Sequence, residues 1–131
     1  MVVDASVVVA ALVDDDHTGD WARKTLRSAE LVAPHLMPTE VAETLRRSVI
    51  HGGTLARAAT LAHNDLLELR VALYPYAAVA ERAWELRGNL TLYDAWYVAL
   101  AEGLNTELIT LDARLARAPG PRCGFRMPET R

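Results

Sequence analysis

The sequence predicts an α/β fold, a three-layer sandwich in which helices flank a central, mostly parallel sheet. Two observations favour it: short apolar, β-branched runs alternate with longer helical segments, and no repeat, low-complexity segment or linker interrupts them. Strands that alternate with helices pair in parallel, because each crossover helix returns the chain to the same end of the sheet. We therefore expect a single domain over residues 1–131, long enough to bury a core without disulfides or structural metal.

In the first half of the chain, turn residues and prolines separate the expected elements. A strand over 1–4 ends in Asp4, and the apolar segment after it predicts a helix over 5–13. The acidic run over 14–19 is typical of a solvated turn, since it lacks the spaced ligands of a calcium loop. Pro38 suits the first turn of a helix, where its missing N–H has no partner anyway. The elements that follow the acidic turn are a helix over 21–29, a strand over 31–33, a helix over 38–50, and a helix from Thr54 with Leu55, Ala58, Ala59, Ala62, Leu66 and Leu69 inward.

In the second half, the apolar run over 107–111 is the clearest strand, and it ends on Asp112 as the first strand ends on Asp4. The other expected elements are a strand over 70–74, helices over 77–87, 91–103 and 113–118, and a terminal strand around 125–127. Ligands of open α/β sheets bind at the carboxyl ends of the strands. The two acids that close the strands are therefore the first candidates for a functional site.

The charge balance restricts how this protein can handle a polyanion. The chain has 17 acidic and 14 basic residues, a formal net charge of −3, and Lys24 is the one base that is not an arginine. Proteins that depend on bulk attraction to nucleic acid are usually basic. If this protein binds phosphates, it must therefore do so through local arginines or through a bound cation.

Cysteine content and hydropathy predict a cytoplasmic protein. The single cysteine, Cys123, excludes a disulfide framework and a Cys/His zinc cluster, and it is typical of a reducing compartment. The longest apolar run, over 5–13, is far short of the roughly 20 residues that span a bilayer. We expect no membrane association.

Asp4 and Asp112 each allow two interpretations. Either carboxylate can cap the helix that follows it, by accepting hydrogen bonds from free N–H groups of the first turn. Alternatively, the two belong to one site, because the carboxyl ends of neighbouring parallel strands meet at the same edge of a sheet. Two strands that both end in Asp favour the site.

Asp94 has a strong capping alternative as well. With Thr91 it forms the Asp version of a capping box at the start of a helix. It also shares a helical face with Val98 and Ala101, so its side chain is expected to lie along the inward stripe. A buried acid needs a cation or hydrogen-bond donors, because an unpaired buried charge is costly.

Glu40 and Glu43 lie one turn apart near the start of a predicted helix. Both suit the helix dipole there, and spacing alone does not choose between them as site residues. The hydroxyls of Ser6 and Thr110 each lie two residues from a candidate acid. They could hold a metal-bound water or a phosphate oxygen, or simply cap a helix. Arg114 and Arg117 share a helix after Asp112 and could contact RNA or be solvated.

Four segments of the sequence, in this order, carry a family resemblance. They are Val-Asp-Ala-Ser at 3–6, Pro-Thr-Glu-Val-Ala-Glu-Thr-Leu at 38–45, Leu-Tyr-Asp-Ala-Trp-Tyr-Val-Ala-Leu-Ala at 92–101, and Leu-Ile-Thr-Leu-Asp-Ala-Arg-Leu at 108–115. The chain resembles the PIN-domain family over essentially its whole length, and most closely the VapC-like ribonuclease toxins of prokaryotic toxin–antitoxin pairs.

This resemblance implies a function and a set of site residues. The function is that of a metal-dependent endoribonuclease, a homodimer whose cognate antitoxin blocks the active site. Arg114 stands where some members of the family have a further acid or Asn, so the resemblance does not extend to the ligand of a second metal ion. The implied catalytic and metal-binding residues are Asp4, Glu40, Asp94 and Asp112, with Ser6 and Thr110 in supporting roles and Glu43 as the alternative to Glu40.

The chemistry of the four acids agrees with this implication. Converging carboxylates raise one another's pKa unless a cation intervenes, and ligands with oxygen donors alone select Mg²⁺ or Mn²⁺. Water attack at such a site leaves a 5′-phosphate and a 3′-hydroxyl. Two other functions compete: a non-catalytic PIN-fold module that binds RNA or protein, and an aspartyl-phosphate phosphotransferase. The second requires another acid where Ser6 stands and a later lysine, for which Lys24 is badly placed.

Overall fold

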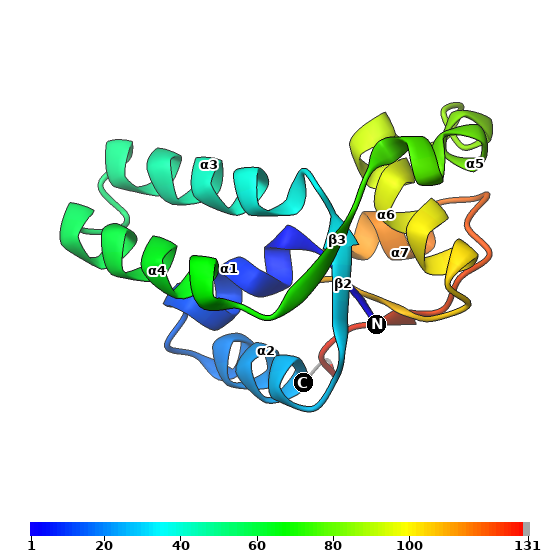
Figure 1. The fold of residues 1–131 in the computed structure, drawn as a ribbon. Coiled ribbons are helices and arrows are strands. Elements are labelled where there is room, and N and C mark those ends of the chain that lie inside the picture. Colours follow the sequence, from blue (N-terminus) through cyan, green and yellow to red (C-terminus); the bar gives the residue numbers. More distant parts are fainter. Residues whose placement is uncertain (130–131) are drawn as a thin grey trace.

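Parallel strands form the centre of the computed structural model, which describes residues 1–129 (Figure 1). The strands are β1 (Val2–Val3), β2 (Leu31–Pro34), β3 (Val71–Tyr74), β4 (Leu108–Ile109) and β5 (Phe125–Arg126). Their order across the sheet is β3-β2-β1-β4-β5, and every neighbouring pair is parallel. The chain thus crosses from one side of β1 to the other. This change of direction creates a crevice outside the carboxyl ends of β1 and its neighbours.

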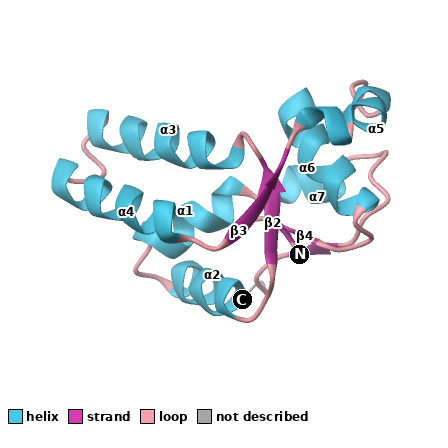
Figure 2. Ribbon diagram, in the orientation of Figure 1, coloured by secondary structure: helices cyan, strands magenta, loops and turns pink. Residues whose placement is uncertain are grey.

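Helices cover both faces of this sheet, so the predicted three-layer sandwich is confirmed (Figure 2). One layer contains α1 (Ala5–Val13), α2 (His17–Arg27), α3 (Met37–Ile50) and α4 (Ala56–Glu68). The other contains α5 (Ala80–Glu85), α6 (Leu92–Gly103) and α7 (Ala113–Arg117). Among the helices of residues 1–129, none is long and apolar enough to cross a membrane.

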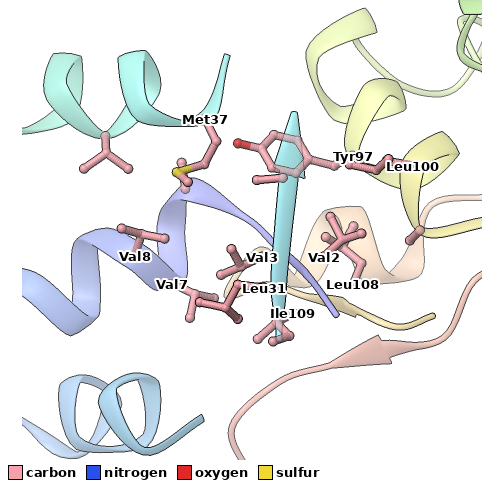
Figure 3. Close-up of a cluster of buried hydrophobic side chains, with 14 of the residues drawn as sticks. Val2, Val3, Val7, Val8, Leu31, Met37, Tyr97, Leu100, Leu108 and Ile109 are labelled. Carbon is pink, nitrogen blue, oxygen red and sulfur yellow. The ribbon is translucent and has the colours of Figure 1, made fainter. Parts of the chain in front are cut away.

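The register of the two central strands positions the residues of the crevice. All side chains of β1 and β4 are fully buried, as expected where helices cover both faces (Figure 3). Val3 lies opposite Ile109, and the N–H of Asp4 donates to the Ile109 carbonyl over 2.9 Å. The next residues of the two strands, Asp4 and Thr110, therefore leave the sheet at the same edge.

The acidic turn after α1 is shorter than the turn that the sequence predicted over 14–19, because α2 begins at His17 rather than at Trp21. Asp16 caps this helix through a carboxylate oxygen that accepts the Gly19 N–H over 3.1 Å. Gly19 passes so close to the Asp14 carbonyl that a Cβ would lie 2.0 Å from its oxygen. The prediction missed a helix start whose signal was present, an Asp followed by a turn of polar residues.

Two further expectations were wrong in detail. Leu55 lies just before α4 and is 79% exposed, and Ala58 is exposed as well, so the first turn of that helix does not face the core. The single helix expected over 77–87 is divided into a short 3₁₀ turn, Tyr76–Ala78, and α5. Val79 separates them, because its backbone, with φ −132° and ψ 11°, is not helical.

Candidate active site

Asp4 lies at the carboxyl end of β1, where it precedes α1. Its backbone has the extended geometry of an N-cap residue, yet its side chain makes no capping hydrogen bond. One carboxylate oxygen, Oδ2, instead accepts two hydroxyls, from Ser6 over 2.7 Å and from Thr110 over 2.8 Å. The capping interpretation therefore fails for the Asp4 side chain.

Ser6 and Thr110 are themselves oriented by backbone groups. The Ser6 oxygen accepts the Leu111 N–H over 3.2 Å, and the Thr110 oxygen accepts the Asp112 N–H over 3.0 Å. Since both oxygens already accept, their O–H groups are free to donate to Asp4. The sequence left three roles open for these hydroxyls: to hold a metal-bound water, to hold a phosphate oxygen, or to cap a helix. In the structure neither hydroxyl caps a helix, and both donate to the Asp4 carboxylate.

Asp112 follows the end of β4 and does cap its helix. Its Oδ1 accepts the N–H groups of Arg114 over 3.0 Å and Leu115 over 3.3 Å, at the start of α7. This confirms the capping interpretation for one oxygen. Oδ2 makes no hydrogen bond within residues 1–129, and Asp112 lines the same cavity as Asp4.

Asp94 lies in the first turn of α6. Thr91 caps this helix, because its hydroxyl oxygen accepts the Asp94 N–H over 3.2 Å. Burial raises the pKa of the Asp94 carboxyl, and the charges of Asp4 and Asp112 raise it further, whereas Thr91 and Arg114 act in the opposite direction. Asp94 is therefore close enough to the two strand-end acids to be affected by their charge.

Glu40 lies in the first turn of α3 and is bound from the opposite layer. The buried hydroxyl of Tyr97, in α6, donates to Glu40 Oε1 over 2.6 Å. In Figure 3 the Tyr97 hydroxyl points toward the start of α3. Burial raises the pKa of Glu40, Tyr97 opposes this, and the charges of Asp4 and Asp94 add to it. The same burial and the contact with Glu40 raise the pKa of Tyr97 far above its ordinary value.

Tyr97 binds one of the candidate acids, and sequence reasoning did not find it. Its side chain is 1% exposed, and a buried Tyr hydroxyl usually has a hydrogen-bond partner. The position three residues after Asp94, on an inward helix face, was the available signal. Nothing local identifies its partner, since the Glu40 carboxylate is 57 residues away in the chain.

Glu43 differs from Glu40 in its partners. Its two oxygens accept from Arg46, over 2.6 Å from Nε and 2.9 Å from an outer guanidinium nitrogen, and its side chain remains 44% exposed. The hydrogen bond from Arg46 holds the pKa of Glu43 below its ordinary value. Both glutamates line the cavity, but only Glu40 has its pKa raised by the charges of other acids of the site.

We call Asp4, Glu40, Asp94 and Asp112 the carboxylate set. Burial is the largest cause that raises the pKa of Asp4, and Ser6, Thr110 and the Asp112 charge act on it as well. In the described chain, none of the four forms an ion pair with Lys, Arg or His. Three of the set line a cavity of about 760 Å³, and the charge of Asp94 raises the pKa of one of these three, Glu40.

The donor chemistry of the carboxylate set fits a hard divalent cation. All donors are oxygens, and a cation would relieve the mutual repulsion that raises the pKa values. Within residues 1–129, no three His, Cys, Asp or Glu side chains lie together in a group that could by itself hold a metal ion. Mg²⁺ does not require one, because it keeps several waters and binds to one or two carboxylates together with substrate phosphates.

Arg114 and Arg117, the candidate RNA contacts, lie on α7 with exposed side chains. Neither lines the cavity, and Arg114 acts on the site through its effect on the pKa of Asp94. Their contact with RNA remains a prediction.

The fold, together with the acids at the ends of its strands, identifies the protein family. The family described as the PIN domain matches residues 1–121, and the chain belongs to this family. Within it, the sequence groups with the VapC-like ribonucleases, so the predicted resemblance is confirmed. Ribonuclease VapC9 of Mycobacterium tuberculosis is 41% identical over 123 residues, 94% of each chain. Ribonuclease VapC1 of the same organism is 40% identical over 127 residues, 96% of each chain.

Solved structures agree on the fold. PAE2754 from Pyrobaculum aerophilum superimposes with a TM-score of 0.69 at 27% identity, over 95% of this chain and 81% of its own. VapC20 of M. tuberculosis, a toxin that cleaves the sarcin–ricin loop, gives 0.66 at 20% identity, over 87% and 91%. VapBC2 from Rickettsia felis, bound to a DNA fragment from its promoter, gives 0.64 at 12% identity, over 96% of each chain. At 20% and 12% identity, the last two bear on the fold alone.

Proposed function

We propose that this chain is a metal-dependent endoribonuclease that acts as the toxin of a type II toxin–antitoxin pair. Relatives named as ribonucleases, similar over nearly the whole chain, support the RNA-cleaving activity. One observation carries the metal dependence: burial and mutual charge raise the pKa of Asp4, Glu40 and Asp94, and the described chain offers them no ion pair. A site of this kind is completed by a cation from outside the chain.

Asp4, Glu40, Asp94 and Asp112 would hold Mg²⁺ or Mn²⁺. When bound, such an ion offsets the repulsion between the acids and a phosphodiester, polarises the phosphoryl group and lowers the pKa of water. The chain itself fixes the donor atoms before RNA arrives. Its hydroxyls hold Oδ2 of Asp4, Tyr97 holds Oε1 of Glu40, and the start of α7 holds Oδ1 of Asp112. The other oxygen of each of these three carboxylates makes no hydrogen bond within residues 1–129 and remains available.

The proposed product is RNA with a 5′-phosphate and a 3′-hydroxyl. The described chain has no histidine among the residues that line the cavity, and the acids there suit attack by water rather than by the RNA 2′-hydroxyl. Detection of a 2′,3′-cyclic phosphate at the cut ends would contradict this chemistry.

The remaining parts of the proposal concern the cellular setting. We propose a cognate antitoxin that binds at the acidic cavity, a homodimeric toxin, and a cytoplasmic location. The similarity to ribonucleases named VapC, together with the fold shared with VapBC2, supports an antitoxin as partner. The single cysteine is consistent with the cytoplasm.

The test is cleavage of total cellular RNA by the purified, antitoxin-free protein. The reaction is run with Mn²⁺ or Mg²⁺, with a chelator, and with the Asp94→Asn variant, and new 5′ ends are mapped. Asp65→Asn is the matched control, because Asp65 lies on α4 with an exposed side chain outside the cavity. We expect discrete cuts with metal that disappear with chelator and in Asp94→Asn, but not in Asp65→Asn. Cuts that persist in chelator would overturn the metal dependence, and the absence of cuts together with absent Mn²⁺ binding would leave the non-catalytic module.

A further inference from the structure

The cavity at the carboxylate set is larger than a cation requires. Its volume of about 760 Å³ lies in the range of cavities that hold organic ligands. Besides acids, its lining includes one aromatic ring, Tyr93, and one cation, Arg47. These two residues are not needed to hold a metal, and they are the types that bind single-stranded RNA.

Tyr93 places an aromatic ring in water beside the site. It immediately precedes Asp94 in α6, and its side chain is 64% exposed although it lines the cavity. No hydrogen bond is made by its hydroxyl within residues 1–129. An exposed Tyr ring that is not used in packing offers a flat surface on which a base can stack.

Arg47 is the lone Lys or Arg among the described residues that line the cavity. It lies on α3 seven residues after Glu40, so the two are separated by about 10 Å along the helix axis. Its neighbour Arg46 pairs with Glu43, whereas Arg47 makes no ion pair within residues 1–129. This separation of the two residues along α3 favours contact of Arg47 with a phosphate next to the scissile one rather than with the scissile phosphate itself.

We propose that Tyr93 and Arg47 form a nucleotide subsite of the carboxylate set, in which the Tyr93 ring stacks on a base and Arg47 binds a neighbouring phosphate of single-stranded RNA. The inference rests on the proposed RNA-cleaving function and adds the residues that hold the strand. It also accounts for RNA binding by a chain whose net charge is −3, because the cation is local.

The experiment measures binding rather than cleavage. Fluorescence anisotropy follows a labelled, short single-stranded RNA of mixed sequence, in chelator, with Asp94→Asn as the background that removes cleavage and one negative charge. A second oligomer of the same length carries abasic positions, so that it keeps the phosphates and lacks the bases. On this background we compare Tyr93→Ala, Tyr93→Phe and Arg47→Gln. Matched controls are Trp84→Ala, an aromatic side chain 57% exposed outside the cavity, and Arg57→Gln, an exposed arginine of α4.

Tyr93→Ala is expected to weaken binding of the normal oligomer about tenfold and to leave binding of the abasic oligomer unchanged, because only the base stacks. Tyr93→Phe, which keeps the ring, should bind like the background protein. Arg47→Gln should weaken both oligomers and reduce the slope of log K against log salt by about 0.7, the value for one phosphate contact on a single strand. The control variants should bind like the background protein.

The proposal is overturned if Tyr93→Ala binds the normal oligomer unchanged, if it weakens both oligomers equally, or if the background protein binds neither. The two proposals also fail separately. Binding that depends on Tyr93 without metal-dependent cuts in total RNA would reject the nuclease and retain the subsite. Metal-dependent cuts that Tyr93→Ala and Arg47→Gln make at the same rate as the original protein would reject the subsite and retain the nuclease.

Discussion

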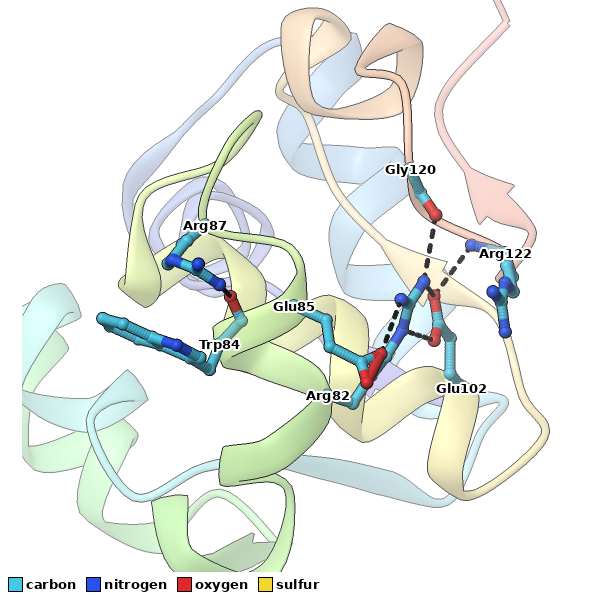
Figure 4. A network of polar contacts seen from close by, with 7 residues as sticks. All are labelled: Arg82, Trp84, Glu85, Arg87, Glu102, Gly120 and Arg122. Atoms are coloured by element: carbon cyan, nitrogen blue, oxygen red, sulfur yellow. Dashed lines mark hydrogen bonds and ion pairs between the residues drawn. The ribbon is translucent and has the colours of Figure 1, made fainter.

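Two groups of partly buried charged side chains in this molecule differ in whether their neighbours neutralise them. The first is the carboxylate set. The second, which we call the arginine cluster, joins α5, α6 and the loop before β5 through Arg82 and Glu102 (Figure 4). Arg82 Nε donates to Glu102 over 2.6 Å, and the same guanidinium donates to Glu85 over 3.3 Å and to the Gly120 carbonyl over 3.0 Å. The Arg122 N–H completes the set of donors to Glu102, over 2.8 Å.

Burial acts in the same direction on both groups, and the neighbours decide the result. Burial alone would raise the pKa of Glu102, but the hydrogen bonds and charges of Arg82 and Arg122 outweigh it and lower the value. The side chains that donate hydrogen bonds to Asp4 are two neutral hydroxyls. Their effect on the pKa of Asp4 does not outweigh that of burial, so this pKa stays raised. The arginine cluster therefore neutralises its own charge and stabilises the fold. The carboxylate set keeps an unneutralised charge, which in our proposal is offset by a bound cation.

Asp4→Asn is expected to have the largest effect on function. The substitution keeps the shape of the side chain and removes the charge that the hydroxyls of Ser6 and Thr110 hold in place. RNA cleavage should fall by more than about 100-fold, since even supporting residues of metal sites cost 10- to 100-fold. In chelator the melting temperature should rise, because a costly buried charge is lost. Cleavage assays measure the loss of activity, and calorimetry measures the melting temperature. If the Asp4→Asn variant is inactive because it no longer folds, the proposed contrast between the carboxylate set and the arginine cluster is wrong.

Glu102→Gln should have the opposite profile. Glu102 has a side chain that is 13% exposed and two donors that would lose their charged partner. We expect a loss of about 2 kcal/mol in the free energy of unfolding, typical of hydrogen bonds to a charged group, with cleavage unchanged at a temperature where the variant is folded. Urea unfolding and cleavage assays measure the two quantities. Reduced cleavage by the folded variant would show that the two groups are coupled.

Tyr97→Phe tests whether the carboxylate set is oriented from the opposite layer. Removing one hydroxyl leaves Glu40 without its 2.6 Å hydrogen bond while the ring still fills the core. We expect cleavage to fall about tenfold, with an increase in the Mn²⁺ concentration required for half-maximal activity, as for supporting residues of metal sites. A rate that falls equally at all Mn²⁺ concentrations would instead indicate a purely structural role for Tyr97.

The sequence predicted the elements that present the site better than the contacts within it. The parallel sheet, its flanking helices and the position of Asp4 at a strand end all follow from local patterns, and the structure confirms them. Partner choice does not follow from local patterns. Thr110 binds an acid 106 residues away because of the register between β1 and β4, and no spacing rule contains that register.

The same limit explains the glutamates. Spacing in the sequence did not distinguish Glu40 from Glu43 at the start of one helix, and Glu40 was the first candidate with Glu43 as its alternative. Their difference arises from the layer above, which supplies Tyr97 to one, and from a helix neighbour, Arg46, which pairs with the other. The roles of the carboxylate set in metal binding and catalysis remain predictions, because they depend on a ligand.

Stability as a function of pH should separate the two groups by the sign of a slope. Asp4, Glu40 and Asp94 have raised pKa values, so the folded state holds more protons than the unfolded state between the ordinary and the raised values. Their contribution to stability therefore falls as pH rises through that window. Glu102, with a lowered pKa, contributes stability that is present above its ordinary value and is lost as pH falls.

Calorimetry in chelator, from about pH 4 to pH 7, measures the stability of each variant relative to that of the parent protein. Asp4→Asn should gain most in stability at the upper end of the range, and Glu102→Gln should lose most there. If the two variants shift the profile in the same direction, the proposed contrast between the groups is wrong.

Glu43→Gln is expected to have the smallest effect, and it decides which glutamate belongs to the carboxylate set. Both Glu43 oxygens are engaged by Arg46, and the exposed pair contributes little, so cleavage should stay within about twofold of the parent. Glu40→Gln provides the matched comparison, one turn earlier on the same face of the cavity. If Glu43→Gln loses as much cleavage as Glu40→Gln, the Arg46 pair must open when a cation binds. In that case both glutamates serve the site, and the hydrogen bond from Tyr97 does not by itself distinguish a ligand from its neighbour.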